Sequence, residues 1–191
     1  MEGILNCLFI QLWDARQKNA ILNCAHQFPL TACCLSLNGT VAYVAGVDNV
    51  IRAYDLRNNV ELYSLTGHAD TITGLRISPD SSFLLSSAMD NLCIIWDIRP
   101  FTPSSTRLLR VFEGAPHGFE KNLIRPAWSA DASMVACGSA DRTVVIWDAL
   151  STKILYKLPG HKGCVNQVDF HPSEPIIASC SSDRQIFLGE L

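Results

Sequence analysis

Short apolar segments separated by polar turns recur along this 191-residue chain. One such segment starts seven residues before each of four aspartates, at Val41, Phe83, Met134 and Ile176. Another comes before it, as in Ile72-x-x-Leu75-x-Ile77, and a third follows the aspartate, most clearly at residues 143–147. Because β-branched and aromatic residues dominate these segments, each one predicts a β-strand. No stretch sustains the 3.6-residue period of a helix, so we predict an all-β chain with almost no helix.

The aspartates that follow these segments mark a repeat. They lie 42, 51 and 42 residues apart, at Asp48, Asp90, Asp141 and Asp183. An acidic residue follows each one after seven positions, and an aromatic residue precedes it in three copies: Tyr54-Asp55, Trp96-Asp97 and Trp147-Asp148. Trp13-Asp14 lies 41 residues before Tyr54-Asp55. A repeat of about 40–45 residues that ends in Trp-Asp is typical of WD-repeat β-propellers, which this chain therefore resembles.

The repeat divides the chain into predicted units of one propeller domain. Four blades are expected, over residues 20–57, 61–99, 108–150 and 154–191. Residues 1–19 hold only the remnant of an upstream blade behind a non-matching N-terminal stub, because Cys7 stands where a turn aspartate would be. Since closed propellers have about 4–8 blades, we interpret the chain as the C-terminal part of a larger ring, truncated or fragmentary on its N-terminal side. Such an open arc would expose the edge of a sheet.

The composition limits the kinds of partner and the kinds of chemistry that we expect for this chain. The net charge of -3 comes with scattered lysines and arginines, which give no basic field for nucleic acid, so contact with RNA is expected only indirectly. The eight cysteines form no C-x-x-C pair and are interpreted as buried free thiols in a reducing compartment. The five histidines share no ligand spacing with them, so we predict neither a metal site nor a cofactor.

One long segment lacks charged side chains. Residues 19–47 contain no Asp, Glu, Lys or Arg, which is enough length to raise the question of a membrane span. His26, Pro29 and the Asn38-Gly39 pair interrupt the segment, so a pair of buried strands around a turn explains it better. The N-terminus has no basic region and only a short apolar run, so no signal peptide is predicted.

Polar residues recur at fixed positions within the repeats. In WD repeats a histidine, a serine of the second strand, the turn aspartate and the third-strand tryptophan form a buried hydrogen-bonded network. The resemblance assigns these roles to His68, Ser86, Asp90 and Trp96. A His-Ser-Asp set also occurs in hydrolases. Because this set recurs once per repeat, we interpret it as a structural device that satisfies buried polar groups, and we predict no enzyme activity.

The other repeats keep only part of this network. The last repeat lacks the tryptophan, since Gly189 stands in its place. The third has Cys137 in the serine position and a displaced His117. The first has Val44 and Tyr54 in the serine and tryptophan positions. The network residues that these three repeats retain are His161, Ser179, Asp183, Asp141, Trp147 and Asp48.

Arginines follow three of the Trp-Asp or Tyr-Asp pairs. They stand two residues after the aspartate, at Arg16, Arg57 and Arg99. An arginine on a connecting surface loop explains this pattern without any function. The W-D-x-R string also resembles the motif by which some WD-repeat proteins dock on the adaptor of a cullin-type ubiquitin ligase. A substrate receptor of such a ligase is therefore the alternative function, with these arginines as the candidate contacts.

The 51-residue spacing holds an insertion between Arg99 and Lys121. Loops that carry prolines beside aromatic and charged residues are candidate partner contacts. The candidates here are Phe101, His117, Phe119 and Lys121, and a solvated loop between blades is the alternative. Pro126 lies within an expected first strand, where it would remove one hydrogen-bond donor from the ladder.

Longer strings carry a closer resemblance. They occur at residues 67–70, 88–91, 96–101, 119–123, 139–142, 154–161 and 171–177. In order and spacing, insertion included, they resemble the WD-repeat subunits of the U5 small nuclear ribonucleoprotein of the spliceosome, from about residue 9 to residue 191. Two of the strings, Phe-Glu-Lys-Asn-Leu and Leu-Tyr-Lys-Leu-Pro-Gly-His, are not general WD-repeat sequence, which makes the match specific.

This resemblance implies a fold, a role and a set of partners. Members of the family are closed seven-bladed rings, of which this chain would hold about four blades. They are non-catalytic scaffolds that bind proteins in pre-mRNA splicing, in the nucleus. The expected partners are the large splicing factor of the U5 particle and other spliceosomal proteins, including a GTPase and a helicase. No small-molecule substrate, cofactor or membrane is implied.

Overall fold

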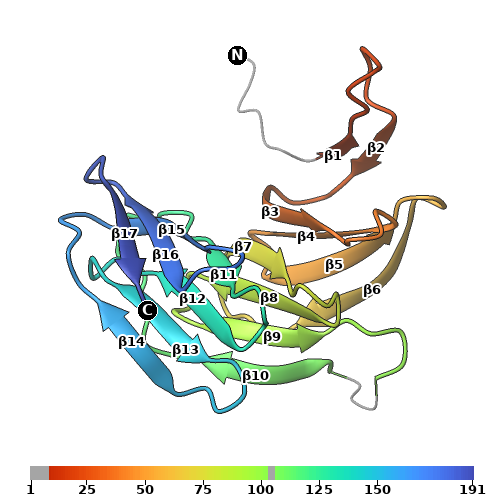
Figure 1. The fold of residues 1–191 in the computed structure, drawn as a ribbon. Coiled ribbons are helices and arrows are strands. Elements are labelled where there is room, and N and C mark those ends of the chain that lie inside the picture. The colour runs from red at the N-terminus through yellow and green to blue at the C-terminus, as the bar shows by residue number, and fades with distance from the viewer. Residues whose placement is uncertain (1–8, 103–105) are drawn as a thin grey trace.

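The computed structural model describes residues 9–102 and 106–191, which form the strands β1 to β17 (Figure 1). The predicted stub at the N-terminus, with Cys7, lies outside the described residues. The described part contains no helix, so the all-β prediction is confirmed. It consequently holds no apolar helix of the length needed to cross a membrane.

The strands form one hairpin and four antiparallel sheets. The hairpin consists of β1 (Phe9–Leu12) and β2 (Leu22–Ala25). The first sheet consists of β3 (Leu30–Leu35), β4 (Val41–Gly46), β5 (Val50–Asp55) and β6 (Val60–Thr66). The second consists of β7 (Ile72–Ile77), β8 (Phe83–Ala88), β9 (Cys93–Asp97) and β10 (Leu108–Phe112). The third consists of β11 (Pro126–Trp128), β12 (Met134–Gly138), β13 (Val144–Asp148) and β14 (Ile154–Leu158), and the fourth of β15 (Val165–Phe170), β16 (Ile176–Ser181) and β17 (Ile186–Glu190).

Each sheet is offset by one strand from the predicted units. The strands β6 and β10 open the predicted ranges 61–99 and 108–150, yet they hydrogen-bond to β5 and β9 at the outer edge of the preceding sheet. In the same way β14 pairs with β13. A sequence repeat therefore gives its first strand to the sheet before it and its last three strands to a sheet of its own.

The sheets stand side by side as consecutive blades of a partial β-propeller, with β3, β7, β11 and β15 along the inner side (Figure 1). Threonine hydroxyls join neighbouring sheets there. Thr31 in β3 donates to the carbonyl of Ile72 in β7. Thr73 in β7 donates to the carbonyl of Ile124, just before β11, at 2.8 Å. These bonds satisfy carbonyls that face a neighbouring sheet rather than a paired strand.

The core lies between the faces of neighbouring sheets. Adjacent residues of a strand point to opposite faces, and β8 is buried on both. Leu84 belongs to the cluster shared with the first sheet, while Leu85 belongs to the cluster shared with the third. Trp96 and Trp147 are the largest fully buried side chains in these two clusters. Burial on two faces explains why the middle strands read as continuous apolar runs rather than as alternating patterns.

The proline at the start of β11 accompanies a short strand. β11 spans only three residues, from Pro126 to Trp128. Arg125, just before the strand, and Trp128, its last residue, connect it to the adjacent sheets. The backbone N–H of Arg125 donates to the carbonyl of Asn166 at 2.9 Å. The indole N–H of Trp128 donates to the carbonyl of Arg76 at 3.2 Å. The inner strand of the third sheet is therefore held by both adjacent sheets.

Candidate functional site

Each repeat turns at its aspartate. The residue after the aspartate has a left-handed backbone, with φ between 63° and 71°, at Asn49, Asn91, Arg142 and Arg184. In three repeats a carboxylate oxygen accepts the backbone N–H two residues further on, as between Asp90 and Leu92 at 3.0 Å. These bonds satisfy a donor that the turn would leave unpaired, which explains the fixed place of the aspartate.

The second sheet brings together His68, Ser86, Asp90 and Trp96. The indole N–H of Trp96 donates to Ser86 Oγ at 2.8 Å. Ser86 Oγ lies 2.7 Å from His68 Nε2, and His68 Nδ1 lies 2.9 Å from Asp90 Oδ2. Since a carboxylate only accepts, Nδ1 carries a proton, and the Nε2 of a neutral ring then accepts from the serine hydroxyl. The four side chains form one directed chain of hydrogen bonds, from the indole to the carboxylate.

Asp90 stays ionised inside this network. Burial raises its pKa, but hydrogen bonds from His68 and from the backbone N–H of Ala69 outweigh burial and leave the pKa below its ordinary value. Ser86 is completely buried, so its hydroxyl is out of reach of a substrate. The geometry is that of a buried bracing network between the turn and the sheet.

The fourth sheet repeats the polar part of this network. His161 Nδ1 lies 3.0 Å from Asp183 Oδ2, and His161 Nε2 lies 2.9 Å from Ser179 Oγ. Where the second sheet has an indole, the ring of Phe187 lies against the histidine, with the two centroids 4.4 Å apart. Sequence reasoning missed Phe187 because it stands two residues before the tryptophan position, which is Gly189.

The third repeat replaces the network with other contacts. Asp141 forms an ion pair with Lys157 at 2.7 Å. The indole N–H of Trp147 donates to a backbone carbonyl at 2.9 Å instead of to a serine. Cys137, in the serine position, is buried beside Cys93, and this neighbour together with burial raises the pKa of the Cys93 thiol. The third repeat therefore keeps the aspartate and the tryptophan without connecting them.

Three histidines stand outside the networks: His26, His117 and His171. His117 is the displaced histidine of the third repeat, and burial lowers its pKa. His26 stands 22 residues before Asp48, the same spacing as the network histidines have from their aspartates, which sequence reasoning overlooked. Its Nδ1 contacts the backbone of Phe28. Asp48 forms an ion pair with Arg52, four residues further along the chain. The first repeat therefore has an ion pair in place of the histidine network.

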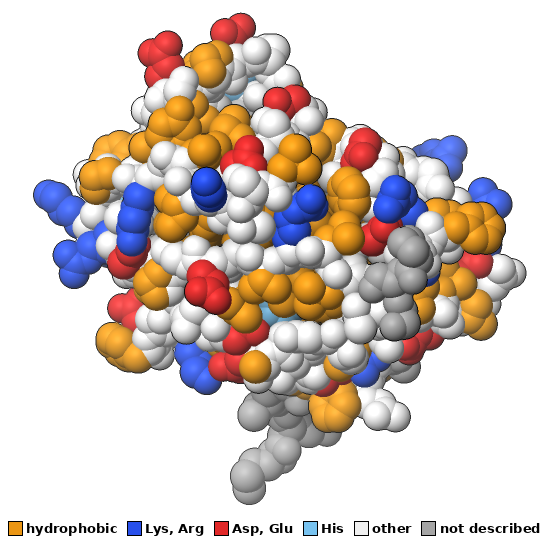
Figure 2. All heavy atoms as spheres, turned by 90° about the horizontal axis from the view of Figure 1, so that it is seen from below, with side chains coloured by type: hydrophobic (Ala, Val, Ile, Leu, Met, Phe, Trp, Pro, Cys, Tyr) orange, Lys and Arg blue, Asp and Glu red, His pale blue; other side chains and the backbone are white. Residues whose placement is uncertain are grey.

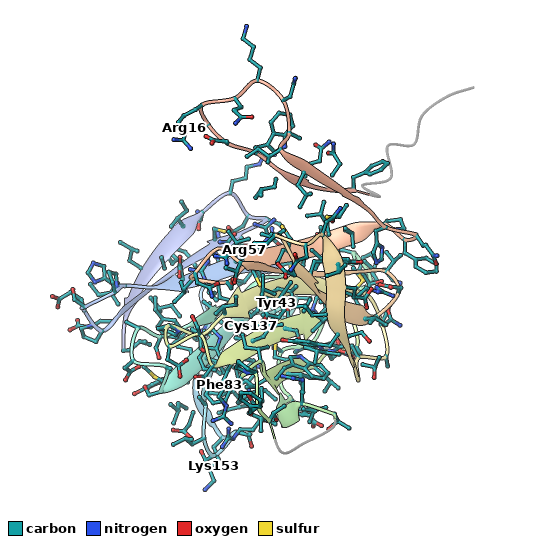
Figure 3. All side chains as sticks on the ribbon, turned by 90° about the vertical axis from the view of Figure 1, so that its right-hand side faces the viewer. Arg16, Tyr43, Arg57, Phe83, Cys137 and Lys153 are labelled. Carbon is teal, nitrogen blue, oxygen red and sulfur yellow. The ribbon has the colours of Figure 1, made fainter. Side chains whose placement is uncertain are left out.

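The three W-D-x-R arginines lie in turns that follow a strand. The strands β5 and β9 end with the pairs before Arg57 and Arg99, whereas β1 ends at Leu12, just before Trp13-Asp14. Arg16 forms an ion pair with Asp14 at 2.7 Å, and Arg99 forms one with Asp97 at 2.5 Å. The backbone N–H of Arg57 donates to the aspartate of its own pair. Figure 3 shows Arg16 on the projecting β1–β2 hairpin, well separated from Arg57. Docking on a ligase adaptor stays a prediction.

The insertion forms two loops rather than one. Phe101 lies in the connection from β9 to β10, whereas His117, Phe119 and Lys121 lie in the connection from β10 to β11. Because β10 runs along the whole second sheet, the two loops lie at opposite ends of it. Phe101 and Phe119 are each 95% exposed. The structure thus places Phe101 near the turn of Arg99 and separates both from the other three candidates.

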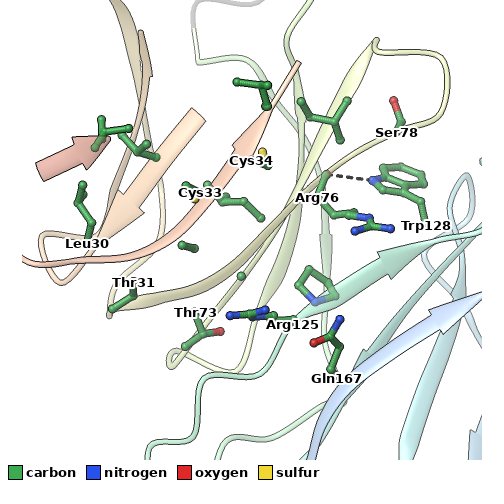
Figure 4. A pocket seen from close by; sticks show the side chains of 18 of the residues that line it. Leu30, Thr31, Cys33, Cys34, Thr73, Arg76, Ser78, Arg125, Trp128 and Gln167 are labelled. Atoms are coloured by element: carbon green, nitrogen blue, oxygen red, sulfur yellow. Dashed lines mark hydrogen bonds between the residues drawn. The ribbon is translucent and has the colours of Figure 1, made fainter. Parts of the chain in front are cut away.

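A cleft of about 830 Å³ runs along the inner strands β3, β7 and β11 (Figure 4). Arg76, Arg125 and Gln167 are among its polar side chains, and Trp128 supplies an aromatic wall. Arg76 lies 3.6 Å from Asp169, with both side chains about half exposed. Sequence reasoning did not find this cleft, because its residues come from several repeats and meet only in the folded arc.

The remaining surface is mixed in character. Figure 2 shows, from below, groups of apolar side chains set among lysines, arginines and carboxylates. The outer strand β14 exposes Ile154, Leu155 and Tyr156. In the part of the chain that the structure describes, no three His, Cys, Asp or Glu side chains are placed to hold a metal ion. Mixed apolar and charged surface of this kind is suited to contacts with other proteins.

Comparison with known proteins identifies the repeat and its relatives. The family described as "WD domain, G-beta repeat" matches residues 59–97, 116–148 and 152–188. Over 182 residues the chain is 49% identical to the pre-mRNA-splicing factor cwf17 of Schizosaccharomyces pombe, which covers 95% of this chain and 53% of that protein. It is 48% identical to the U5 small nuclear ribonucleoprotein 40 kDa protein of Homo sapiens and 49% identical to that of Dictyostelium discoideum, covering 95% of this chain and 51% of each relative. The chain therefore spans about half the length of the curated relatives it matches.

Proposed function

The chain belongs to the WD-repeat family, and on that premise we propose that it serves as a non-catalytic, protein-binding scaffold of the U5 small nuclear ribonucleoprotein in pre-mRNA splicing. The observation that carries this proposal is the identity of 48–49% over 95% of the chain to relatives named for splicing and for the U5 particle. A match of that extent includes the inter-blade loops as well as the repeated strands.

The surface supports a scaffold. Phe101 and Phe119 are almost fully exposed at opposite ends of the second sheet, and the cleft along the inner strands offers Arg76, Arg125 and Trp128. Exposed aromatic and arginine side chains are the residues that most often anchor protein interfaces. The arc therefore offers three separate places for partners, as a scaffold requires.

The finer parts of the proposal concern partners and place. The large splicing factor of the U5 particle is the proposed direct partner, and the nucleus is the proposed location. With 15 basic against 18 acidic residues, the chain has no excess of positive charge to hold phosphates, so RNA is proposed to be reached through the bound proteins.

Affinity purification of the tagged 191-residue chain from its own cells tests the proposal. We expect U5 proteins, the large splicing factor among them, to be enriched in the eluate by mass spectrometry and to remain after ribonuclease treatment. Recovery without any splicing protein would refute the scaffold role. Loss of all partners on ribonuclease treatment would refute direct protein binding.

Single surface variants locate the contact. Phe101→Ser and Phe119→Ser each remove one exposed aromatic, at opposite ends of the second sheet. Leu150→Ser is the matched control, because Leu150 is also exposed and lies in the β13–β14 turn of the third sheet. We expect one of the phenylalanine variants to lower recovery of the large factor about tenfold, as loss of an interface anchor does, while the control leaves it unchanged.

A further inference from the structure

Connections between strands form one end of the third and fourth sheets. They join β10 to β11, β12 to β13, β14 to β15 and β16 to β17. The backbone N–H of Ala140 donates to the carbonyl of Pro116 at 2.9 Å, which links the first two connections. The N–H of Val165, at the start of β15, donates to the carbonyl of Ser139 at 3.0 Å. The N–H of Ser182 donates to the connection before β15 at 2.9 Å. The connections therefore form one continuous surface, which we name the turn face.

The turn face carries cationic side chains that have no partner within the described residues. Lys121 and Arg142 belong to the connections beside the third sheet, and Lys162 and Arg184 belong to those of the fourth. All of them are exposed, and among the described residues their side chains form neither an ion pair nor a hydrogen bond. Arg125, in the same connection as Lys121, lines the cleft described above. These charges are therefore available to a ligand.

Most carboxylates of the turn face already have partners. Asp141 forms an ion pair with Lys157 at 2.7 Å. Asp183 accepts two backbone N–H groups, at 2.8 Å and 2.9 Å. Glu120 accepts a side-chain N–H at 2.9 Å, and Glu113 stands at the outer margin, just after β10. The acidic groups of this surface are thus largely used within the chain, whereas the cationic groups are not.

The same end of the first and second sheets differs in charge. The residue after the turn aspartate is Asn49 or Asn91 there, whereas it is Arg142 or Arg184 in the third and fourth sheets. The connection from β6 to β7 contains Asp70 and neither lysine nor arginine. Because asparagine adopts the left-handed backbone of this position more readily than arginine, the turn itself does not require the positive charge. The cations gather on one half of this end, although they are scattered along the sequence.

An exposed aromatic ring stands among these cations. Phe119 is 95% exposed in the connection from β10 to β11, two residues before Lys121. The preceding Gly118 lies against the β12–β13 turn, where a Cβ added to it would be 3.1 Å from that of Ala140. Phe119 is therefore held next to the turn that carries Arg142. Exposed aromatic and arginine side chains are common anchors of protein interfaces.

We propose that the turn face binds an acidic segment of a partner protein. Carboxylates of the segment pair with Arg142, Lys162 and Arg184, and one of its apolar side chains packs on Phe119. Arginine suits this role because its guanidinium donates two parallel hydrogen bonds to one carboxylate. The carboxylate of Asp141, set among the cations, repels a continuous phosphate backbone, whereas a peptide can place single carboxylates beside the cations. This inference deepens the scaffold proposal by naming the chemistry of one partner, and it rests on that proposal only for its biological setting.

Fluorescence anisotropy of a labelled peptide, titrated with the 191-residue chain, tests the proposal. The probe is a short peptide of alternating aspartate and glutamate with one central leucine. We expect it to bind at low salt and to bind more weakly as salt screens the charges. The double variant Arg142→Gln with Arg184→Gln should weaken binding about three- to tenfold. The matched control is Lys18→Gln with Lys153→Gln, which removes the same charge from the β1–β2 hairpin and from the opposite end of the third sheet. This control should bind as the unaltered chain does.

A second variant and a second probe test the apolar contact. Phe119→Ser should weaken binding of the leucine peptide about fivefold but should not change binding of a peptide with serine in place of leucine. An equal effect on both peptides would contradict the contact at Phe119.

Three results would overturn the proposal. They are no binding of the peptide by the unaltered chain, equal weakening by the two double variants, and binding of a single-stranded RNA of the same charge as tightly as the peptide. The second would show attraction by net charge alone, and the third would show that the partner is not a protein. None of these results changes the recovery of U5 proteins by affinity purification, so a failure here is distinguishable from a failure of the scaffold proposal.

Discussion

The second and fourth sheets contain the same three polar residues in nearly the same geometry but different surroundings. The histidine–aspartate distances are 2.9 Å and 3.0 Å, and the histidine–serine distances are 2.7 Å and 2.9 Å. The second sheet adds Trp96 and the outer strand β10, whereas the fourth has Gly189 and, among the described residues, no strand beyond β17. The polar triad therefore forms without the tryptophan, and the two parts of the network have separable roles. The triad holds the turn, and the tryptophan fills the space between sheets.

The largest expected effect comes from removing the tryptophan. Trp96→Ala should lower the free energy of unfolding by about 3–4 kcal/mol, because it leaves a large cavity between the first and second sheets. Urea unfolding followed by circular dichroism measures the change. Trp13→Ala is the control, since Trp13 is exposed, and it should stay within about 0.5 kcal/mol of the unaltered chain. A loss below about 1 kcal/mol at Trp96 would contradict the packing role.

Removing the turn aspartate of the second sheet should have a somewhat smaller effect. Asp90→Ala leaves the His68 ring and the backbone N–H groups of Ala69 and Leu92 without their acceptor. The expected loss is about 2–3 kcal/mol, the cost of unsatisfied buried donors, measured by the same urea titration. If the double variant with Trp96→Ala lost only as much as Trp96→Ala alone, the separation of the two roles would be wrong.

Acid should weaken both triads through their aspartates. The pKa of Asp183 is lowered to about 2, mainly by a hydrogen bond from the backbone N–H of Lys162, although burial raises it. Hydrogen bonds from the backbone N–H of Gln185 and from the His161 side chain lower it further. The pKa of Asp90 is also lowered. A depressed pKa gives stability that is present above the unfolded value of about 4 and is lost as pH falls toward the folded value. Urea midpoints should therefore drop between about pH 4 and pH 2. Asp183→Asn should show a shallower drop, and an unchanged slope would exclude this contribution.

The smallest effect is expected at the position that distinguishes the two sheets. Gly189→Ala should raise the free energy of unfolding by about 0.5–1 kcal/mol, because glycine within a strand costs conformational entropy and the added Cβ meets only ordinary contacts. Thermal unfolding by calorimetry measures the change. A decrease would show that Gly189 is required by the backbone, and the comparison with Trp96 would then fail.

Much of the fold follows from the sequence, because local signals repeat. The apolar segments and the turn aspartates gave the strands and the family, and the comparisons confirm the family. The sheet to which each outer strand belongs did not follow, since β6, β10 and β14 pair across the boundaries of their repeats. Periodicity within a segment carries no information about which neighbour it joins.

The sites were less predictable than the fold. The spacing from His68 to Asp90 shows which residues can meet, but the same spacing from His26 to Asp48 leads to no hydrogen bond. His26 Nδ1 contacts the backbone of Phe28, and Asp48 pairs with Arg52. The cleft at Arg76 is formed where residues of several sheets meet, and no single segment of the sequence encodes it. The sequence likewise suggested one loop for the insertion, whereas the strand β10 divides it into two loops.

The offset between repeats and sheets has a consequence for how the molecule unfolds. The first strand of a repeat pairs with the sheet of the preceding repeat. One repeat therefore cannot unfold without removing the outer strand of the adjacent sheet. The stability of such an array is the sum of the stability of each repeat and of the interaction free energy between adjacent repeats. Here part of that interaction consists of backbone hydrogen bonds between strands, in addition to side-chain contacts. Unfolding should accordingly be cooperative across the whole arc, and a protease cut in one connecting loop should destabilise two sheets at once.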